Sequence, residues 1–179
     1  NLTLVGAVDT DLGLHGSDLR AAERTFQLIR QVSGRAGRTG DQGLALLQTY
    51  QPEHRVIRAI LSGEDEAFCS AEAAEREEAG MPPYGRLAGV VISAPEAEPA
   101  FELGARLARA DAPLRKVGAV VYGPAVAPIA RVRGRHRVRL LVQAAKGVAL
   151  QPAITAWLDP VPPPRGVRLS VDIDPQTFY

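Results

Sequence analysis

The sequence has few of the residues from which disulfide frameworks and metal sites are built. Cys69 is the single cysteine among 179 residues, which excludes an internal disulfide framework and gives no partner for a zinc site. The three histidines, at positions 15, 54 and 136, lack the spacing of metal ligands. We therefore expect Cys69 to be a buried or half-buried hydrophobic residue, each histidine to be structural or on the surface, and the compartment to be a reducing cytoplasm.

The net charge is small, and the sequence has no long apolar run. The formal charge is +1, so no global field attracts the chain to nucleic acid or to membranes, and only local patches can do so. No apolar run reaches the roughly 18 residues that span a bilayer, and no membrane partner is expected. The apolar fraction of 46% is ordinary and allows a sizeable core.

Complete catalytic motifs are missing from the sequence. It contains no G-x-x-x-x-G-K-[ST] loop, no C-x-x-C, no H-E-x-x-H and no G-x-S-x-G. Asp9, Asp11 and Asp18 cluster after the first predicted strand, where they could bind a metal or organise a loop through capping and turn contacts. The chain therefore has no self-sufficient catalytic constellation, and we predict no metal site.

The first third of the chain has an α/β pattern. Residues 2–8 and 43–50 read as strands buried on both faces. Between them Asp18 is a plausible N-cap for a helix with an apolar stripe formed by Leu19, Ala22, Phe26, Ile29 and Val32. Strand, helix and strand without a hairpin turn predict a parallel βαβ crossover. A short helix opened by Pro52 and a connector helix over residues 64–79 follow.

A domain boundary is expected at residues 80–85, which read Gly-Met-Pro-Pro-Tyr-Gly and cannot continue a helix. Beyond it we predict strands at 87–94, 117–132, 136–144 and 167–173, with helices at 96–110 and 147–158. Prolines 124 and 128 mark the second of these strands as a bulged or edge strand, or as two short strands at a bend. The order β-α-β-β-α-β predicts a ferredoxin-like arrangement.

The stretch from Gln31 to Arg38 reads Gln-Val-Ser-Gly-Arg-Ala-Gly-Arg at the predicted end of the first helix. Arg35 and Arg38 each follow a glycine, Gly34 or Gly37. Guanidinium groups bind phosphate oxygens bidentately, and glycine allows a backbone to turn tightly and approach a ligand closely. The alternative is a helix C-terminus with two solvated arginines.

Arginine occupies every odd position in the second cluster: Arg131, Arg133, Arg135, Arg137 and Arg139. We call residues 131–139 the basic hairpin. Apolar residues hold most of the neighbouring even positions, so a strand period of two separates a cationic face from an apolar face. Keeping that separation in both strands requires an odd-numbered loop around Gly134 or a bulge. The cationic face either binds phosphate backbones or is a solvated face whose arginines pair with Asp and Glu elsewhere.

Together these stretches resemble the C-terminal part of the primosomal protein N′ (PriA) family of replication-restart DNA helicases, which belongs to superfamily 2. The resembling runs are VDTDLGLHGSDLRAAERTFQLIRQVSGRAGR, QTYQPEH, MPPYGRLA, VYGPAVAPIARVRGRHRVRLLVQ and VDIDPQTF. They span residues 2–178 in the family's order. The Gln31 to Arg38 run alone occurs in many helicases of the superfamily, whereas its combination with the hairpin and the terminal run is highly specific.

The resemblance implies that residues 1–62 are the last part of the second RecA-like helicase lobe, 63–83 a helical connector and 84–179 the C-terminal DNA- and partner-binding domain. It also implies that the Gln31 to Arg38 run is helicase motif VI. Arg38 would then be the arginine finger, Arg35 a second phosphate contact and Gln31 an interface or phosphate-sensing partner, with Gly34 and Gly37 shaping the loop.

Further expectations follow from the same resemblance. The family uses ATP and Mg²⁺, holds zinc, and has its Walker A, Walker B, motif V and zinc-binding cysteines upstream of the stretch that this chain matches. We therefore expect a fragment that is inactive alone. Expected partners are forked or single-stranded DNA, other primosome proteins and single-stranded-DNA-binding protein, whose acidic tail Lys146 and Gln151 would contact. The alternatives are a non-enzymatic nucleic-acid or partner-binding module and a structural α/β protein.

Overall fold

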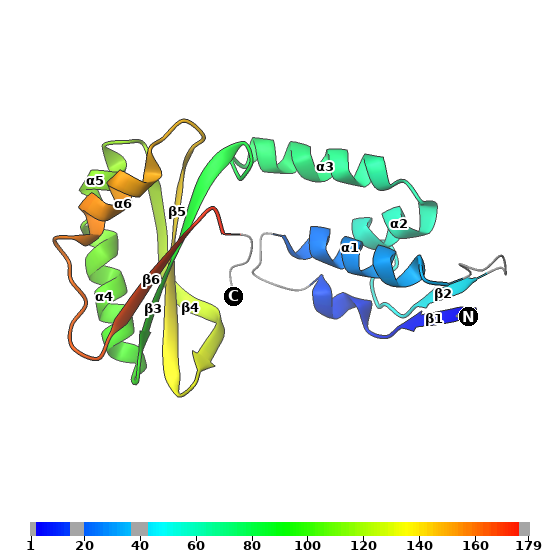
Figure 1. Cartoon of the computed structure of the whole chain (residues 1–179), viewed down its shortest axis with the longest axis horizontal. Helices are drawn as coiled ribbons and strands as arrows, with labels where there is room; N and C mark the ends of the chain where they lie inside the picture. The colour runs from blue at the N-terminus through cyan, green and yellow to red at the C-terminus, as the bar shows by residue number, and fades with distance from the viewer. Residues whose placement is uncertain (1–2, 15–19, 37–42, 176–179) are drawn as a thin grey trace. The chain divides into compact units, whose positions relative to one another are not determined.

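The computed structural model describes residues 3–14, 20–36 and 43–175. They form a mixed α/β protein with a parallel two-stranded sheet and an antiparallel four-stranded sheet (Figure 1). The chain divides into two compact units, residues 1–74 (unit 1) and residues 75–179 (unit 2). The division falls within helix α3, Asp65–Glu78, inside the segment predicted to connect two domains. Among the described residues, no helix is both long and apolar enough to cross a bilayer.

Unit 1 contains the predicted parallel crossover. Strands β1, Leu4–Ala7, and β2, Leu44–Leu47, pair in parallel, and helix α1, Ala21–Ser33, lies between them in the chain. The prediction that both strands are buried on both faces is wrong. Leu4, Leu44 and Leu46 are each more than half exposed, while Leu47 packs against the buried cluster. The strands alternate in burial because, in the described part of unit 1, the helices cover one face of the pair.

The start of α1 differs from the prediction. A 3₁₀ turn, Thr10–Gly13, follows β1, and the N-cap of α1 is Arg20, whose side chain makes no capping hydrogen bond. The proposed cap at Asp18 and the stripe residue Leu19 lie outside the described residues. Of the remaining stripe, Phe26 and Ile29 are buried, whereas Val32 near the helix end is 38% exposed.

The core of unit 1 joins α1 to α2, Arg55–Ser62, and to α3. It consists of Phe26, Ile29, Val56, Ile57, Ile60 and Phe68. The rings of Phe26 and Phe68 stack with their centroids 4.2 Å apart. Helix α2 begins at Arg55 rather than at Pro52 because His54 is its N-cap, with Nδ1 accepting from the Val56 amide. Cys69 is exposed, which contradicts the buried assignment, since Phe68 next to it takes the inward position on α3.

Unit 2 follows the predicted order of elements, with one short helix added. Its elements are β3 (Gly85–Ala94), α4 (Ala97–Arg109), α5 (Ala112–Arg115), β4 (Val120–Val132), β5 (Arg135–Ala145), α6 (Leu150–Leu158) and β6 (Arg168–Ile173). The strands pair in the order β4-β5-β3-β6, and every neighbouring pair is antiparallel. The central strand β3 therefore hydrogen-bonds to both β5 and β6.

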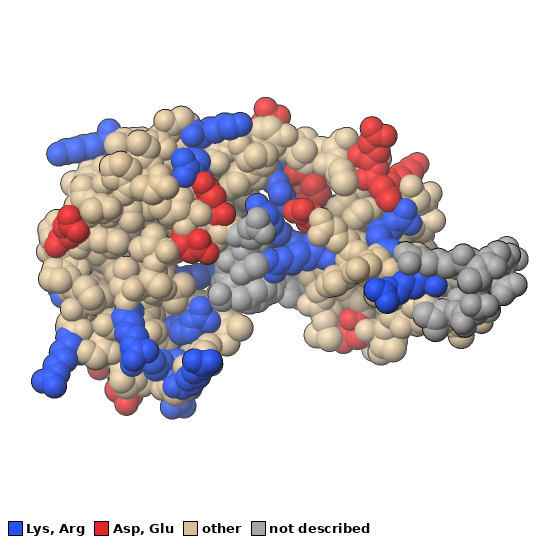
Figure 2. Space-filling view, in the orientation of Figure 1, with Lys and Arg blue, Asp and Glu red and all other residues tan. Residues whose placement is uncertain are grey.

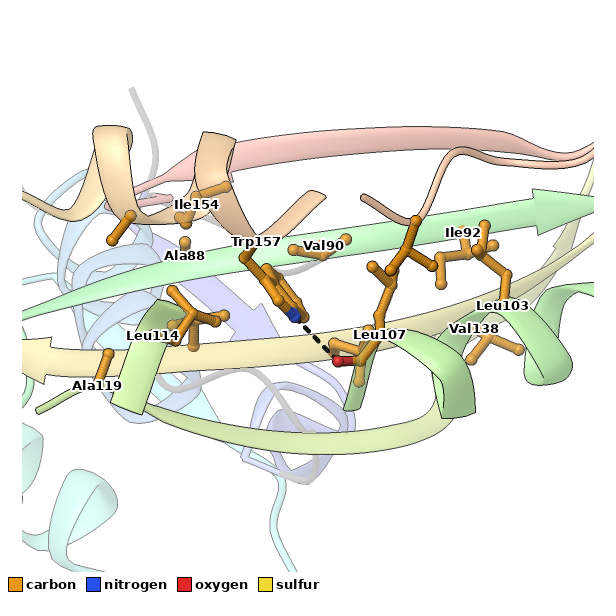
Figure 3. Packing of buried hydrophobic residues seen from close by; sticks show 14 of the residues in the cluster. Ala88, Val90, Ile92, Leu103, Leu107, Leu114, Ala119, Val138, Ile154 and Trp157 are labelled. Atoms are coloured by element: carbon orange, nitrogen blue, oxygen red, sulfur yellow. Dashed lines mark hydrogen bonds between the residues drawn. The ribbon is translucent and has the colours of Figure 1, made fainter. Parts of the chain in front are cut away.

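Helices α4 and α6 pack on one face of this sheet, which we call the inner face (Figure 1). It is formed by the even-numbered residues of β3 and β5, such as Val90, Ile92 and Val138, which are at most 1% exposed. Trp157 of α6 is fully buried among them, and its indole Nε1 donates to the carbonyl oxygen of Leu107 at 2.9 Å (Figure 3). This bond satisfies the single polar atom of the indole ring.

The turn of the basic hairpin differs from the odd-numbered loop that the sequence suggested. Arg133 and Gly134 form a two-residue turn with φ of 49° and 76°, and Val132 pairs with Arg135. Bulges are present as well, because the register shifts between Val126 and Arg131 and again between Tyr122 and Ala125, but they do not keep the cationic and apolar faces apart next to the turn, where Arg131 pairs with His136. β4 is accordingly an edge strand with irregular pairing, as its prolines predicted.

Arg135 holds three chain segments together at the edge of unit 2. Its Nη2 donates to the carbonyl oxygens of Ser93 and Gly166, both at 2.7 Å, and its Nε donates to the Ser93 hydroxyl at 3.3 Å. The end of β3 and the loop before β6 are thereby joined to the start of β5. Arg137 makes no such contact in the part of the chain that the structure describes.

We predict that Arg135→Gln destabilises unit 2 by about 1–3 kcal/mol, because hydrogen bonds from a charged group to two carbonyl oxygens are lost. Arg137→Gln serves as the matched control and should change stability by less than about 0.5 kcal/mol. Urea unfolding followed by the fluorescence of Trp157, the single tryptophan, measures unit 2 alone. Equal stability of the two variants would contradict the assignment of Arg135 as a structural residue.

We also predict that Gly85→Ala destabilises unit 2 by about 2 kcal/mol or more. A Cβ at Gly85 would lie 1.9 Å from the carbonyl oxygen of Gly80, a backbone atom that cannot move without displacing the turn that leads into β3. Gly147→Ala is the control, because a Cβ there meets nothing within 4 Å. The same fluorescence measurement compares the two variants, and an unaffected Gly85→Ala protein would refute the expectation.

Candidate nucleotide and nucleic-acid sites

Helix α1 leads into the predicted phosphate-binding stretch and is anchored on one side only. Phe26 and Ile29 are buried in unit 1, whereas Gln31, two residues further on, is exposed. Gln31 lines a shallow surface hollow with Arg24, Gln27 and Leu28. The anchoring of α1 thus leaves Gln31 open to a ligand.

The end of α1 is a tight succession of backbone turns. The amides of Gly34, Arg35 and Ala36 donate to the carbonyl oxygens of Arg30, Val32 and Ser33 at 3.0–3.1 Å. Gly34 has a helical φ of −68°, so this glycine is not required for a left-handed conformation. Arg35 is exposed and has no acidic partner within the described residues. Gly37 and Arg38 lie outside the described residues.

Arg30, one turn before Arg35, is engaged elsewhere. Its Nε donates to Asp65 Oδ2 at 3.0 Å, and Nη2 of the same guanidinium forms an ion pair with that oxygen. Arg55 and Glu72 form a second ion pair in unit 1. These contacts link α1 and the start of α2 to α3, so Arg30 is a structural residue rather than a candidate phosphate ligand.

Asp11 organises the loop that follows β1. It is 5% exposed and accepts hydrogen bonds from the Thr49 hydroxyl at 2.5 Å and from the Tyr50 amide at 2.6 Å. The loop after β1 is thereby tied to the loop after β2, as the loop interpretation of the aspartates predicts. Among the described residues, no group of three or more His, Cys, Asp or Glu side chains is arranged to hold a metal ion.

The five arginines of the basic hairpin do not form one surface. Residues that pair across an antiparallel ladder share a face of the sheet. Arg131 pairs with His136 and therefore lies on the same side as Val138, whereas Arg137 and Arg139 lie on the opposite side, which we call the outer face. Arg133 is in the turn and exposed, and Arg135 holds the backbone contacts described above. We expected one cationic face along both strands. This expectation is wrong for β4, because the bulge reverses the facing of its last residues.

The strand register adds a residue that sequence reasoning missed. Ser93 of β3 pairs with Arg137 on one side and with Arg168 of β6 on the other, so both arginines lie on the outer face. Arg168 is exposed. A space-filling view shows Lys and Arg side chains gathered at the end of unit 2 that carries the β4–β5 turn (Figure 2). Only the pairing of β3 with β6 could have revealed Arg168.

The two residues predicted to bind a partner lie at one end of unit 2. Lys146 is in the turn that follows β5, and Gln151 is in the first turn of α6. Both side chains are exposed. The N-cap residue of α6, Ala149, provides no side-chain hydrogen bond.

Comparisons with known proteins match the whole chain. Residues 77–176 match the family described as Primosomal protein N C-terminal domain. The chain is 38% identical over 179 residues to Replication restart protein PriA of Rickettsia conorii, covering all of this chain and 27% of that protein. It is 39% identical over 177 residues to the protein of that name from Treponema pallidum, covering 97% of this chain and 26% of that protein.

A further relative is Replication restart protein PriA of Bacillus subtilis, with 34% identity over 178 residues, covering 98% of this chain and 22% of that protein. The chain thus spans about a quarter of the length of the curated relatives that it matches. The family match covers more than half of the chain and coincides with nearly all of unit 2. The chain therefore belongs to the primosomal protein N C-terminal domain family.

Proposed function

We propose that this chain is part of an ATP-dependent 3′→5′ DNA helicase that restarts stalled replication forks and assembles the primosome. The observation that carries the proposal is the similarity to proteins named Replication restart protein PriA, which extends over all 179 residues, including α1 and the basic hairpin. The chain would contribute motif VI and a DNA-binding unit. We do not expect the chain alone to hydrolyse ATP.

The fold supports this placement in two ways. A parallel β1–β2 pair with α1 as its crossover is consistent with the last part of a RecA-like lobe in residues 1–62. The antiparallel order β4-β5-β3-β6 with α4 and α6 on one face is consistent with a ferredoxin-like domain in residues 84–179. Residues 63–83 would connect the two.

The nucleotide-binding role is assigned to the end of α1. Arg38 would be the arginine finger, Arg35 a second phosphate contact and Gln31 a phosphate-sensing residue, while Gly34 and Gly37 form the loop. Two observations support this assignment: Arg35 is exposed and has no acidic partner among the described residues, and Gln31 is exposed. ATP and Mg²⁺ would be held mainly by another lobe, and zinc by cysteines elsewhere in the longer protein.

The DNA-binding role is assigned to unit 2. Forked or single-stranded DNA would contact arginines of the basic hairpin, and single-stranded-DNA-binding protein would contact Lys146 and Gln151, alongside other primosome proteins. A second candidate function is a non-enzymatic nucleic-acid or partner-binding module. It is favoured by the core of unit 2, because the described residues that form this core, Trp157 among them, all belong to unit 2.

We predict that Arg38→Ala, in the protein that joins this chain to a Walker A lobe, lowers DNA-stimulated ATP hydrolysis by about 10³-fold or more, because an arginine finger stabilises charge that develops on the γ-phosphate. DNA affinity should be unchanged. Arg58→Ala is the control, since the Arg58 side chain on α2 is 71% exposed and its ion pair with Glu53 is long, at 3.8 Å. Normal turnover by Arg38→Ala would exclude the finger assignment.

For DNA binding, we predict that the chain carrying Arg133→Gln, Arg137→Gln and Arg139→Gln binds a forked duplex more weakly than the unchanged chain. Each lost phosphate contact should flatten the dependence of log K on log[NaCl] by about 0.7–0.9. Arg135 is left in place because of its structural contacts. A variant with Arg106→Gln, Arg109→Gln and Lys116→Gln removes the same three charges from exposed positions on and after the helices α4 and α5. Equal affinities and slopes for the two variants would contradict the hairpin assignment.

A further inference from the structure

We propose that the outer face of the unit 2 sheet is a track for one DNA strand. Arg137, Arg139 and Arg168 would hold phosphates, and Tyr122 would stack on a base. This inference rests on the proposed DNA-binding function and makes it more specific. The proposed site is no longer the group of hairpin arginines but a surface that crosses all four strands of the sheet. It assigns roles to Tyr122 and Arg168, which lie outside the basic hairpin.

The register brings the three arginines together. Arg168, Ser93 and Arg137 lie side by side on β6, β3 and β5, and the next row toward Tyr122 holds Ser170, Val91 and Arg139. Strands are about 4.8 Å apart and alternate residues about 6.8 Å apart, so the three arginine Cα atoms lie within about 10 Å of a neighbour. Long side chains at this spacing can reach consecutive parts of one nucleic-acid backbone.

The three arginines carry positive charge that no described acidic side chain pairs with. One acidic residue on the outer face, Asp172, pairs with Gly89 and is exposed, two rows away from Arg168 along β6. It would repel phosphates from that row, which favours phosphate binding at the arginine end of the face.

Tyr122 supplies an aromatic surface on the same face. It pairs with Leu141, so Arg139 is its diagonal neighbour, a position within reach of long and aromatic side chains. The residue is 50% exposed, and its hydroxyl donates to Gln143 Oε1 at 3.2 Å. Nε2 of Gln143 in turn donates to the carbonyl oxygen of Ala79 at 2.6 Å. The ring is therefore held in place while half of its surface stays accessible.

The sheet surface between the arginines and Tyr122 is uncharged, so bases can pack on it. Val91, Gly89 and Leu141 occupy the central rows of the outer face, and all three are only partly buried. An uncharged surface beside an ordered aromatic ring and a cationic margin is the combination used to bind single strands without sequence preference. In a duplex the bases already stack on one another, so the ring would gain little. We therefore favour a single strand over a duplex.

The test compares variants of the 179-residue chain by fluorescence anisotropy, with a labelled oligothymidine of about 12 nucleotides and a blunt duplex of the same length. Tyr122→Leu should weaken oligothymidine binding by roughly 5-fold or more and leave duplex binding unchanged. Tyr122→Phe, which keeps the ring, should retain most of the affinity. Trp157 fluorescence verifies that each variant is folded.

The same assay tests the arginine row. Arg168→Gln should weaken oligothymidine binding and flatten its salt dependence by about 0.7. Arg109→Gln, which removes the same charge from α4 on the inner-face side, should do neither. The inference is overturned if Tyr122→Leu binds oligothymidine as the unchanged chain does, or if Arg168→Gln behaves like Arg109→Gln. If the unchanged chain binds neither oligonucleotide, the proposed DNA-binding function fails as well.

Discussion

Burial of the inner face of β5 is the constraint on which unit 2 depends. Val138, Leu140 and Val142 are at most 1% exposed beneath α4 and α6. Because side chains alternate along a strand, this burial leaves the odd-numbered residues no position except the outer face. A shift of one residue would expose the valines and bury Arg137 and Arg139, and burying two charges is costly. The positions of these two arginines therefore follow from the packing of the core.

The strand β4 is not subject to the same constraint, and its arginines differ accordingly. As an edge strand it tolerates two register shifts, which accommodate its prolines and change the facing of its last residues. Arg131 consequently lies on the inner side, away from Arg137 and Arg139. The five arginines look equivalent in the sequence but differ in the structure. Arg135 donates hydrogen bonds to carbonyl oxygens of the protein, Arg137 and Arg139 lie on the outer face, and Arg131 and Arg133 lie at the turn.

In unit 1, too, packing of the core decides which polar side chains of a helix stay exposed. Burial of Phe26 and Ile29 orients α1, which leaves Gln31 on the opposite, exposed side. Of its arginines, Arg30 forms an ion pair with Asp65, whereas Arg35 follows the last turn and stays unpaired in the described part of the chain. Charge alone does not distinguish a structural arginine from a candidate ligand. The geometry of the helix end does.

The sequence by itself determined most of the elements and their pairing type. Apolar periodicity predicted α1, α4, α6 and the strands, and the lack of a hairpin turn predicted the parallel crossover, because these depend on local spacing. Only the tertiary structure decided the turn at Arg133 and Gly134, the N-cap of α1, the exposure of Cys69 and the one-sided burial of β1 and β2. It also placed Arg168 beside Arg137, since residues 31 positions apart meet only through a third strand, β3. Side-chain facing across a bulge and the neighbours of a strand are properties of the assembled sheet, which is why local pattern could not supply them.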